Sequence, residues 1–140
     1  MIVLDTNVIS ELMRPAPSGV VLKWVDKQAL LTLYVTAITL AEIRSGIALL
    51  PDERRKLDLT RNFEDGIRPL FGDRVLSFDE PASQSYSHLR ATARAQGLAI
   101  GNVDGLIAAI ARTHGFMIAT GDVSPFRAAG LHVINPFDDM

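Results

Sequence analysis

Cysteine is absent from this 140-residue chain, and lysine is scarce, with Lys23, Lys27 and Lys56 the only three. Without cysteine, neither a disulfide framework nor a thiolate-bound zinc site can form. The formal net charge is −2, which argues against a protein that holds nucleic acid mainly through a basic surface. If the chain acts on nucleic acid, bound cations must supply part of the attraction.

Targeting and membrane signals are also missing from the sequence. No apolar run reaches the roughly 18 residues of a membrane-spanning helix. The N-terminal stretch lacks both the basic segment and the long apolar segment of a secretory signal. We therefore expect a soluble, cytoplasmic protein that does not act at a membrane.

Length and apolar content set the scale of the fold. A chain of 140 residues has the usual size of one domain and can bury a core without cross-links. No repeat or polar linker divides it, so we expect a single domain over residues 1–140. Counted with glycine, the apolar share is roughly 54%, above the ordinary 45–50%. This surplus predicts that a partner covers part of the apolar surface.

Short apolar runs alternate with helical patterns along the chain. The runs predicted as strands are residues 2–4, 33–35, 75–78, 116–119 and 132–134. The predicted helices are residues 10–13, 20–27, 39–50, 82–96 and 103–114, with Asn102 capping the last, and a charged segment capped by Asp52. Strands that alternate with crossover helices predict an α/β fold, a three-layer α/β/α sandwich around a mainly parallel sheet.

Four acidic residues map to one edge of the predicted sheet. Asp5 closes the first strand, Glu42 lies in the opening turn of the helix after the second, Asp104 opens the last long helix, and Asp122 follows the fourth strand. Sites in such folds form beyond the carboxyl ends of the strands, so we expect the four carboxylates to share one cleft. Carboxylate oxygens are ligands that suit Mg²⁺ or Mn²⁺, which makes a metal site the leading hypothesis.

Each acidic residue also has a simpler local explanation. Asp5 can cap the helix that follows it, and Glu42 completes a capping box with Thr39. Asp104 can interact with the positive end of its helix dipole, and Asp122 is a typical turn residue. A set of unrelated caps and turns has no reason to lie at one edge of the sheet, so their common position favours the metal site.

Several stretches carry a resemblance to a known family. M-I-V-L-D-T-N-V-I-S-E-L, A-I-T-L-A-E-I-R-S-G-I, V-D-G-L-I-A-A-I-A and I-A-T-G-D resemble PIN-domain toxins of the VapC type, especially the FitB-like branch. F-D-E-P-A and the closing I-N-P-F are similar to that branch too, so the resemblance covers nearly the whole chain. It implies a PIN fold and a metal-dependent endoribonuclease that cuts RNA, often tRNA, as the toxin of a bacterial toxin–antitoxin pair.

The resemblance also implies roles for individual residues. Asp5, Glu42 and Asp104 match the three core acidic positions of the family, and Asp122 matches a fourth, more variable one. These four residues would act as catalytic metal ligands for one or two Mg²⁺ or Mn²⁺ ions.

Two polar residues and one departure complete the comparison with the family pattern. Asn7 and Thr120 match polar positions that commonly support the site. After the fourth strand, Gly121 stands where relatives usually carry a basic residue, and Ser124 and Pro125 replace a second acidic one. Asp122 is therefore the only acid in this stretch.

The resemblance implies partners as well. Toxins of this type commonly form homodimers and bind a cognate VapB-type antitoxin, whose tail places a basic side chain in the acidic cleft. DNA would be contacted only through the antitoxin.

Other functions remain open on the sequence alone. An aspartyl phosphatase would usually carry D-x-D at the first strand, where Asn7 replaces the second acid, and a receiver domain would need a lysine after its last strand. The remaining alternative is a catalytically silent PIN module that acts through an antitoxin in a DNA-binding complex. The four acids are expected in both PIN cases, so sequence does not separate them.

Overall fold

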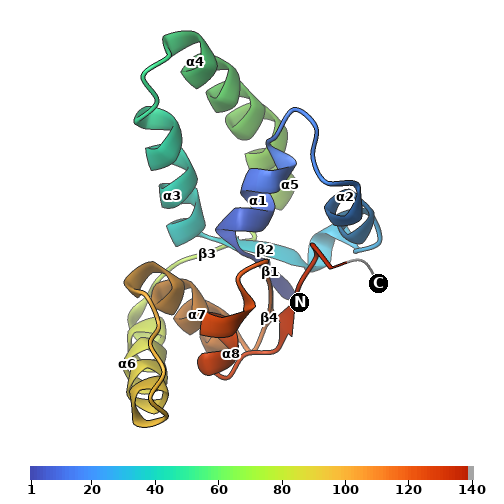
Figure 1. Cartoon of the computed structure of the whole chain (residues 1–140). Helices are drawn as coiled ribbons and strands as arrows, with labels where there is room; N and C mark the ends of the chain where they lie inside the picture. Colours follow the sequence, from blue (N-terminus) through green and yellow to red (C-terminus); the bar gives the residue numbers. More distant parts are fainter. Residues whose placement is uncertain (139–140) are drawn as a thin grey trace.

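The computed structural model describes residues 1–138, and its centre is a five-stranded parallel sheet (Figure 1). The strand order is β3-β2-β1-β4-β5, which confirms the predicted parallel α/β architecture. The strands are β1 (Ile2–Leu4), β2 (Leu33–Thr36), β3 (Val75–Leu76), β4 (Met117–Ala119) and β5 (Val133–Ile134). The third strand is shorter than the predicted residues 75–78.

Both faces of the sheet are buried, which explains why the strands are continuously apolar. All three residues of β1 are buried, and their side chains alternate between the two faces. Ile2 and Leu4 belong to one core, whereas Val3 belongs to the other. These two cores are the interior layers of the sandwich.

The helices divide between the faces in chain order (Figure 1). One face carries α1 (Thr6–Leu12), α2 (Gly19–Asp26), the 3-10 turn η1 (Leu30–Thr32), α3 (Ala37–Ala48), α4 (Glu53–Arg61), the π-helical turn η2 (Asn62–Ile67) and α5 (Arg68–Phe71). The other carries α6 (Glu80–Ala95), α7 (Asn102–His114) and α8 (Val123–Ala128). The first group buries its apolar side chains with Ile2 and Leu4, and the second packs around Val3.

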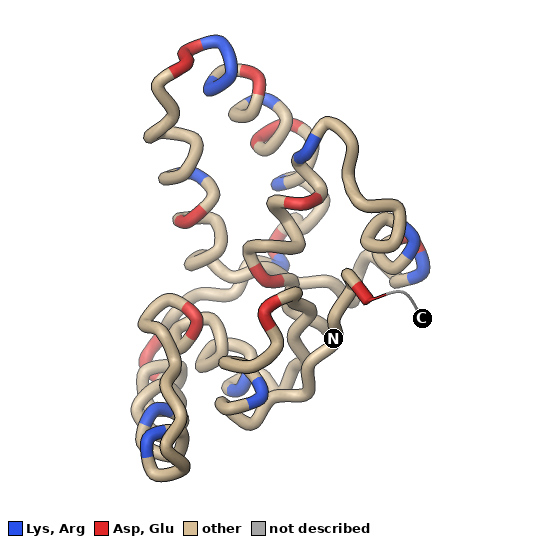
Figure 2. The backbone as a smooth tube through the Cα atoms, in the orientation of Figure 1, with Lys and Arg blue, Asp and Glu red and all other residues tan. Residues whose placement is uncertain are grey.

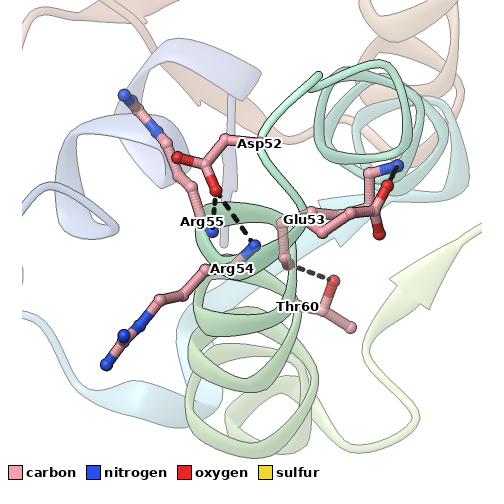
Figure 3. A network of polar contacts seen from close by, with 6 residues as sticks. Asp52, Glu53, Arg54, Arg55 and Thr60 are labelled. Atoms are coloured by element: carbon pink, nitrogen blue, oxygen red, sulfur yellow. Dashed lines mark hydrogen bonds and ion pairs between the residues drawn. The ribbon is translucent and has the colours of Figure 1, made fainter.

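Two predicted helix ends are confirmed in detail. Asp52 accepts hydrogen bonds from the backbone N–H groups of Arg54 and Arg55, so it caps α4 as expected (Figure 3). Gly115 follows α7 with φ 70°, a left-handed conformation that favours glycine.

Several predicted helix starts are wrong. Helix α6 begins at Glu80 rather than residue 82, because Asp79 is its cap. Helix α1 begins at Thr6 rather than residue 10, because Asp5 is its cap. The cap of α3 is Thr36, whose hydroxyl accepts from the N–H of Thr39, so the helix begins earlier than predicted. Gly101, and not Asn102, occupies the cap position of α7.

The helices are too short or too polar for a membrane span. Within residues 1–138, none is both long enough and apolar enough to cross a bilayer.

Candidate active site

The strand order places a crevice beyond the carboxyl end of β1. The chain runs from β1 outward to β2 and β3, and then returns to the opposite side of β1 with β4. Parallel sheets bind ligands at such a reversal point, beyond the strand ends. A hollow of about 510 Å³ lies there. Figure 2 shows acidic positions on several of the elements that meet at this edge of the sheet. The lining of the hollow includes the four predicted acids, Asp5, Glu42, Asp104 and Asp122.

Asp5 is the most buried of these carboxylates, with 4% of its surface exposed. Its backbone N–H donates to the carbonyl of Ala119, which ties the end of β1 to β4. One carboxylate oxygen, Oδ1, accepts from the backbone N–H of Thr6 at 2.8 Å, which is the cap of α1. The cap explanation is thus correct, yet the residue also lines the hollow. A single carboxylate serves both purposes.

The second oxygen of Asp5 is held from β4. Oδ2 accepts from the hydroxyl of Thr120 at 2.8 Å and from the side-chain N–H of Asn7 at 3.3 Å. Asn7 also donates to the Thr120 hydroxyl at 3.0 Å, and its carbonyl oxygen accepts from the N–H of Gly121. Asn7 and Thr120 therefore fix the orientation of Asp5, which is the geometry expected of supporting residues.

Burial raises the pKa of Asp5 from its ordinary value of 3.8 to about 6. The hydrogen bonds from Thr120 and Thr6 oppose this rise, because they stabilise the charged form. Repulsion by the carboxylates of Asp104 and Glu42 adds to it. An ionised Asp5 at neutral pH is therefore costly, and a cation in the hollow would relieve that cost.

Glu42 lies in the second turn of α3, not in the opening turn predicted from sequence. The proposed capping box with Thr39 is wrong, because Thr36 is the cap. Instead, Glu42 accepts a hydrogen bond from the hydroxyl of Thr6 at 2.5 Å. Thr6 and Thr39 are also in contact through their hydroxyls at 3.0 Å, so α1 and α3 jointly direct Glu42 toward the hollow.

Asp104 lies in the first turn of α7 and is partly buried. Burial raises its pKa, and repulsion by Asp122 and Glu42 raises it further. The next residue, Gly105, explains how the helix comes so close to α6. A Cβ at Gly105 would lie 3.0 Å from the ring of Tyr86, so only glycine fits this contact without a shift of the ring. The α6–α7 packing therefore positions Asp104.

Asp122 occupies the cap position of α8, but its carboxylate makes no hydrogen bond to the first turn. Its backbone N–H donates to the hydroxyl of Thr120, which links it to the network around Asp5. The neighbouring Gly121 packs under Phe137, and a Cβ there would lie 3.0 Å from that ring. This contact explains why a larger basic side chain is absent at position 121.

The hollow has a donor set that suits a divalent cation. Its acids supply only oxygen donors, and burial, with mutual repulsion as a smaller cause, raises the pKa values of Asp5 and Asp104. Within residues 1–138, however, no three acidic or histidine side chains are close enough to form a ready-made ligand cluster. The chemistry fits Mg²⁺ or Mn²⁺, and the carboxylates must draw together when such an ion binds.

Sequence reasoning missed other residues that line the hollow. They are Thr6, Ser10 and Glu11, which lie on α1. Arg14, which follows the end of α1, also lines the hollow, although the sequence favours a solvated surface position for it. Thr6 and Ser10 are spaced by four residues, which places them on one side of a helix that starts at Thr6. A helix predicted to start directly after the cap at Asp5 would have brought that spacing to light.

Comparison with known proteins agrees with this fold. The family profile described as PIN domain matches residues 2–131. The chain therefore belongs to the PIN-domain family.

Individual relatives show to which branch of the PIN-domain family the chain belongs. The chain is 53% identical to the plasmid stability protein StbB of Pseudomonas syringae pv. tomato and 51% identical to the VapC ribonuclease Y4jK of Sinorhizobium fredii, over 99% of each protein. It is similar to the crystal structure of FitAcB from Neisseria gonorrhoeae, with TM-score 0.94, 45% identity, and coverage of 98% of this chain and 99% of that one. Within the PIN family it belongs to the VapC and FitB branch.

Proposed function

We propose that this protein is a Mg²⁺- or Mn²⁺-dependent endoribonuclease and the toxin of a VapBC-type toxin–antitoxin pair, with RNA as its substrate and tRNA as the first candidate. The observation that carries the proposal is the meeting of four carboxylates from four separate elements in one hollow. The relatives add support, since one is named a VapC ribonuclease and another a toxin.

Asp5, Asp104 and Glu42 would hold one or two ions, and Asp122 would assist with a second. Such an ion would supply a more acidic water as the nucleophile and would neutralise charge on the phosphate oxygens. The protein's own residues orient these ligands. Asn7 and Thr120 hold Asp5, and Thr6 holds Glu42.

The test is cleavage of total RNA and of a tRNA pool by the purified protein, with mapping of the cut ends. We expect cleavage to require added Mg²⁺ or Mn²⁺, to stop in chelator, and to fall by at least about a hundredfold in Asp5→Asn and in Asp104→Asn. Asp58→Asn, an exposed acid on α4, is the matched control and should cut normally. Full cleavage in chelator or by Asp104→Asn would refute the metal-nuclease proposal. If the wild type cuts no RNA either with or without added metal, the result would favour the catalytically silent PIN module.

A groove beside the hollow fits the antitoxin. It has a volume of about 470 Å³, shares Thr6, Arg14 and Glu42 with the hollow, and has an apolar floor that includes Ile43 and Ile47. A helical antitoxin segment can bury its apolar face on such a floor while a basic side chain reaches the carboxylates. One similar solved structure is described as FitAB bound to an IR36 DNA fragment, with TM-score 0.95 and 44% identity over 100% of this chain and 98% of that one. We propose the same assembly here, a homodimer that reaches DNA only through its antitoxin.

A further inference from the structure

A second groove follows the carboxyl edge of the sheet from β4 to β5. It has a volume of about 730 Å³ and is lined by α2, the start of α8, and the end of β5. Ile134 lines it, and the carbonyl of Ile134 accepts from the backbone N–H of Thr120, which also holds Asp5. Val123, which directly follows Asp122, lines it as well. The groove is therefore the direct neighbour of the acidic hollow.

Three basic side chains line this groove, whereas acids predominate in the hollow. Lys23 and Lys27 are two of the chain's three lysines. Lys23 lies on α2, Lys27 lies one helical turn further on at the C-terminal end of that helix, and Arg127 lies on α8. Figure 2 shows basic positions on both helices. All three basic side chains are exposed, and among the described residues none of them has a carboxylate within 4.0 Å. Asp138 is the one acid that lines the groove, and it accepts from the side chain of Asn135 at 3.3 Å.

An aromatic ring lines the same groove. Trp24, the only tryptophan of the chain, packs partly against the core and lines the groove beside Lys23 and Lys27. Cations that follow a phosphate backbone, together with an aromatic ring on which a base can stack, are the features of sites for single-stranded nucleic acid. A protein of net charge −2 with an acidic catalytic hollow needs such a surface to hold RNA.

We infer that the groove formed by Lys23, Trp24, Lys27 and Arg127 binds the single-stranded RNA segment that leads away from the cut site. The lysines and the arginine bind phosphates, and a base stacks on Trp24. This inference rests on the proposed ribonuclease function and adds the path of the substrate to it. Contacts to phosphates and stacking depend little on sequence, so the groove increases affinity for RNA without selecting the base that is cut.

Trp24 provides a direct measurement, because no other tryptophan contributes to the fluorescence. The full-length protein is titrated with a 12-nucleotide oligouridylate in chelator, so that binding is observed without cleavage. We expect saturable quenching of Trp24. In Lys23→Ala/Lys27→Ala the dissociation constant should rise about tenfold, and the slope of log K against log salt should fall by about 1.4, or 0.7 for each phosphate that is no longer neutralised. The matched control, Arg54→Ala/Arg94→Ala, removes two exposed cations elsewhere.

The outcomes separate this inference from the function on which it rests. Cleavage of RNA without quenching of Trp24 would refute the RNA-binding role of the groove but would support the proposed ribonuclease function. Quenching that depends on the lysines, without any metal-dependent cleavage, would support the groove and refute the ribonuclease. An equal loss of affinity in the control pair, or equal quenching by an oligoglutamate, would overturn the assignment to RNA, because either result indicates nonspecific attraction of any polyanion.

Discussion

At the residue scale, Asp5 both caps a helix and lines the acidic hollow. It caps α1 through one oxygen and is held by Thr120 and Asn7 through the other. The cap and the proposed ligand were competing explanations for this residue in the sequence. The structure shows the cap and also places the carboxylate in the hollow, so the two explanations are compatible. Local patterns could not reveal this position because Thr120, which follows β4, is more than a hundred residues away.

The raised pKa of Asp5 predicts how stability depends on pH in the absence of metal. Its folded-state pKa of about 6 lies above the unfolded value near 3.8, so the folded state is favoured while Asp5 is protonated. This contribution to the free energy of unfolding is fully present below about pH 4 and is lost as the pH rises to about 6. The loss is about 3 kcal/mol, since each pKa unit corresponds to about 1.36 kcal/mol. Denaturation with chelator at pH 4 to 7, in wild type and Asp5→Asn, measures this contribution. A wild-type curve that runs parallel to the variant's would contradict the assignment.

At the element scale, the strands were more predictable than the starts of the helices. Buried parallel strands are short apolar runs, and all five were found within a few residues. Helix starts depend on which of several capping residues is used. T-A-I-T offers both Thr36 and Thr39, and the register of β2 selects Thr36. Neither the Thr6–Glu42 contact nor the close approach of Gly105 to Tyr86 leaves a local signal, because both join distant elements.

Two glycines in helices provide a matched pair for the packing of α7. Gly105→Ala places a methyl group 3.0 Å from Tyr86, and such overpacking costs about 1–3 kcal/mol, more than the gain in helix propensity. Gly46→Ala in α3 meets nothing within 4 Å and should stabilise the fold by about 0.5–1 kcal/mol. Urea denaturation compares the two variants. We also expect Gly105→Ala to reduce RNA cleavage, because Asp104 moves with its helix. Equal stabilisation by both substitutions would show that the α6–α7 contact is not tight.

At the scale of the whole molecule, the exposed apolar residues agree with the proposed partners. Leu31 and Leu49 are 71% and 80% exposed, and the groove along α3 has an apolar floor. A monomer gains nothing from such exposure, so these surfaces favour a dimer and a bound antitoxin.

The antitoxin groove can be blocked without disruption of the fold. Gly46 lines it with open space around its Cα, so Gly46→Leu should fill the groove and exclude the antitoxin segment. Overpacking costs about 1–3 kcal/mol, and about 1.4 kcal/mol corresponds to tenfold in affinity, so we expect binding to weaken by at least about tenfold. RNA cleavage by the free protein should remain. Light scattering of the protein mixed with the antitoxin measures complex formation, and Ala91→Leu on exposed α6 is the control. Unchanged complex formation by Gly46→Leu would place the antitoxin elsewhere.

If the four carboxylates form one site for a divalent cation, the stability of the protein must respond to that cation. Melting curves at pH 7 of wild type and Asp104→Asn, each in chelator and in Mn²⁺, measure this response. We expect Asp104→Asn to melt at a higher temperature than the wild type in chelator, because the substitution removes one repelling charge. We expect Mn²⁺ to increase the free energy of unfolding of the wild type by RT ln(1 + [L]/Kd) and to leave that of the variant nearly unchanged. If the variant melts below the wild type in chelator and neither responds to Mn²⁺, the acids are only caps and turn residues, and the shared site is refuted.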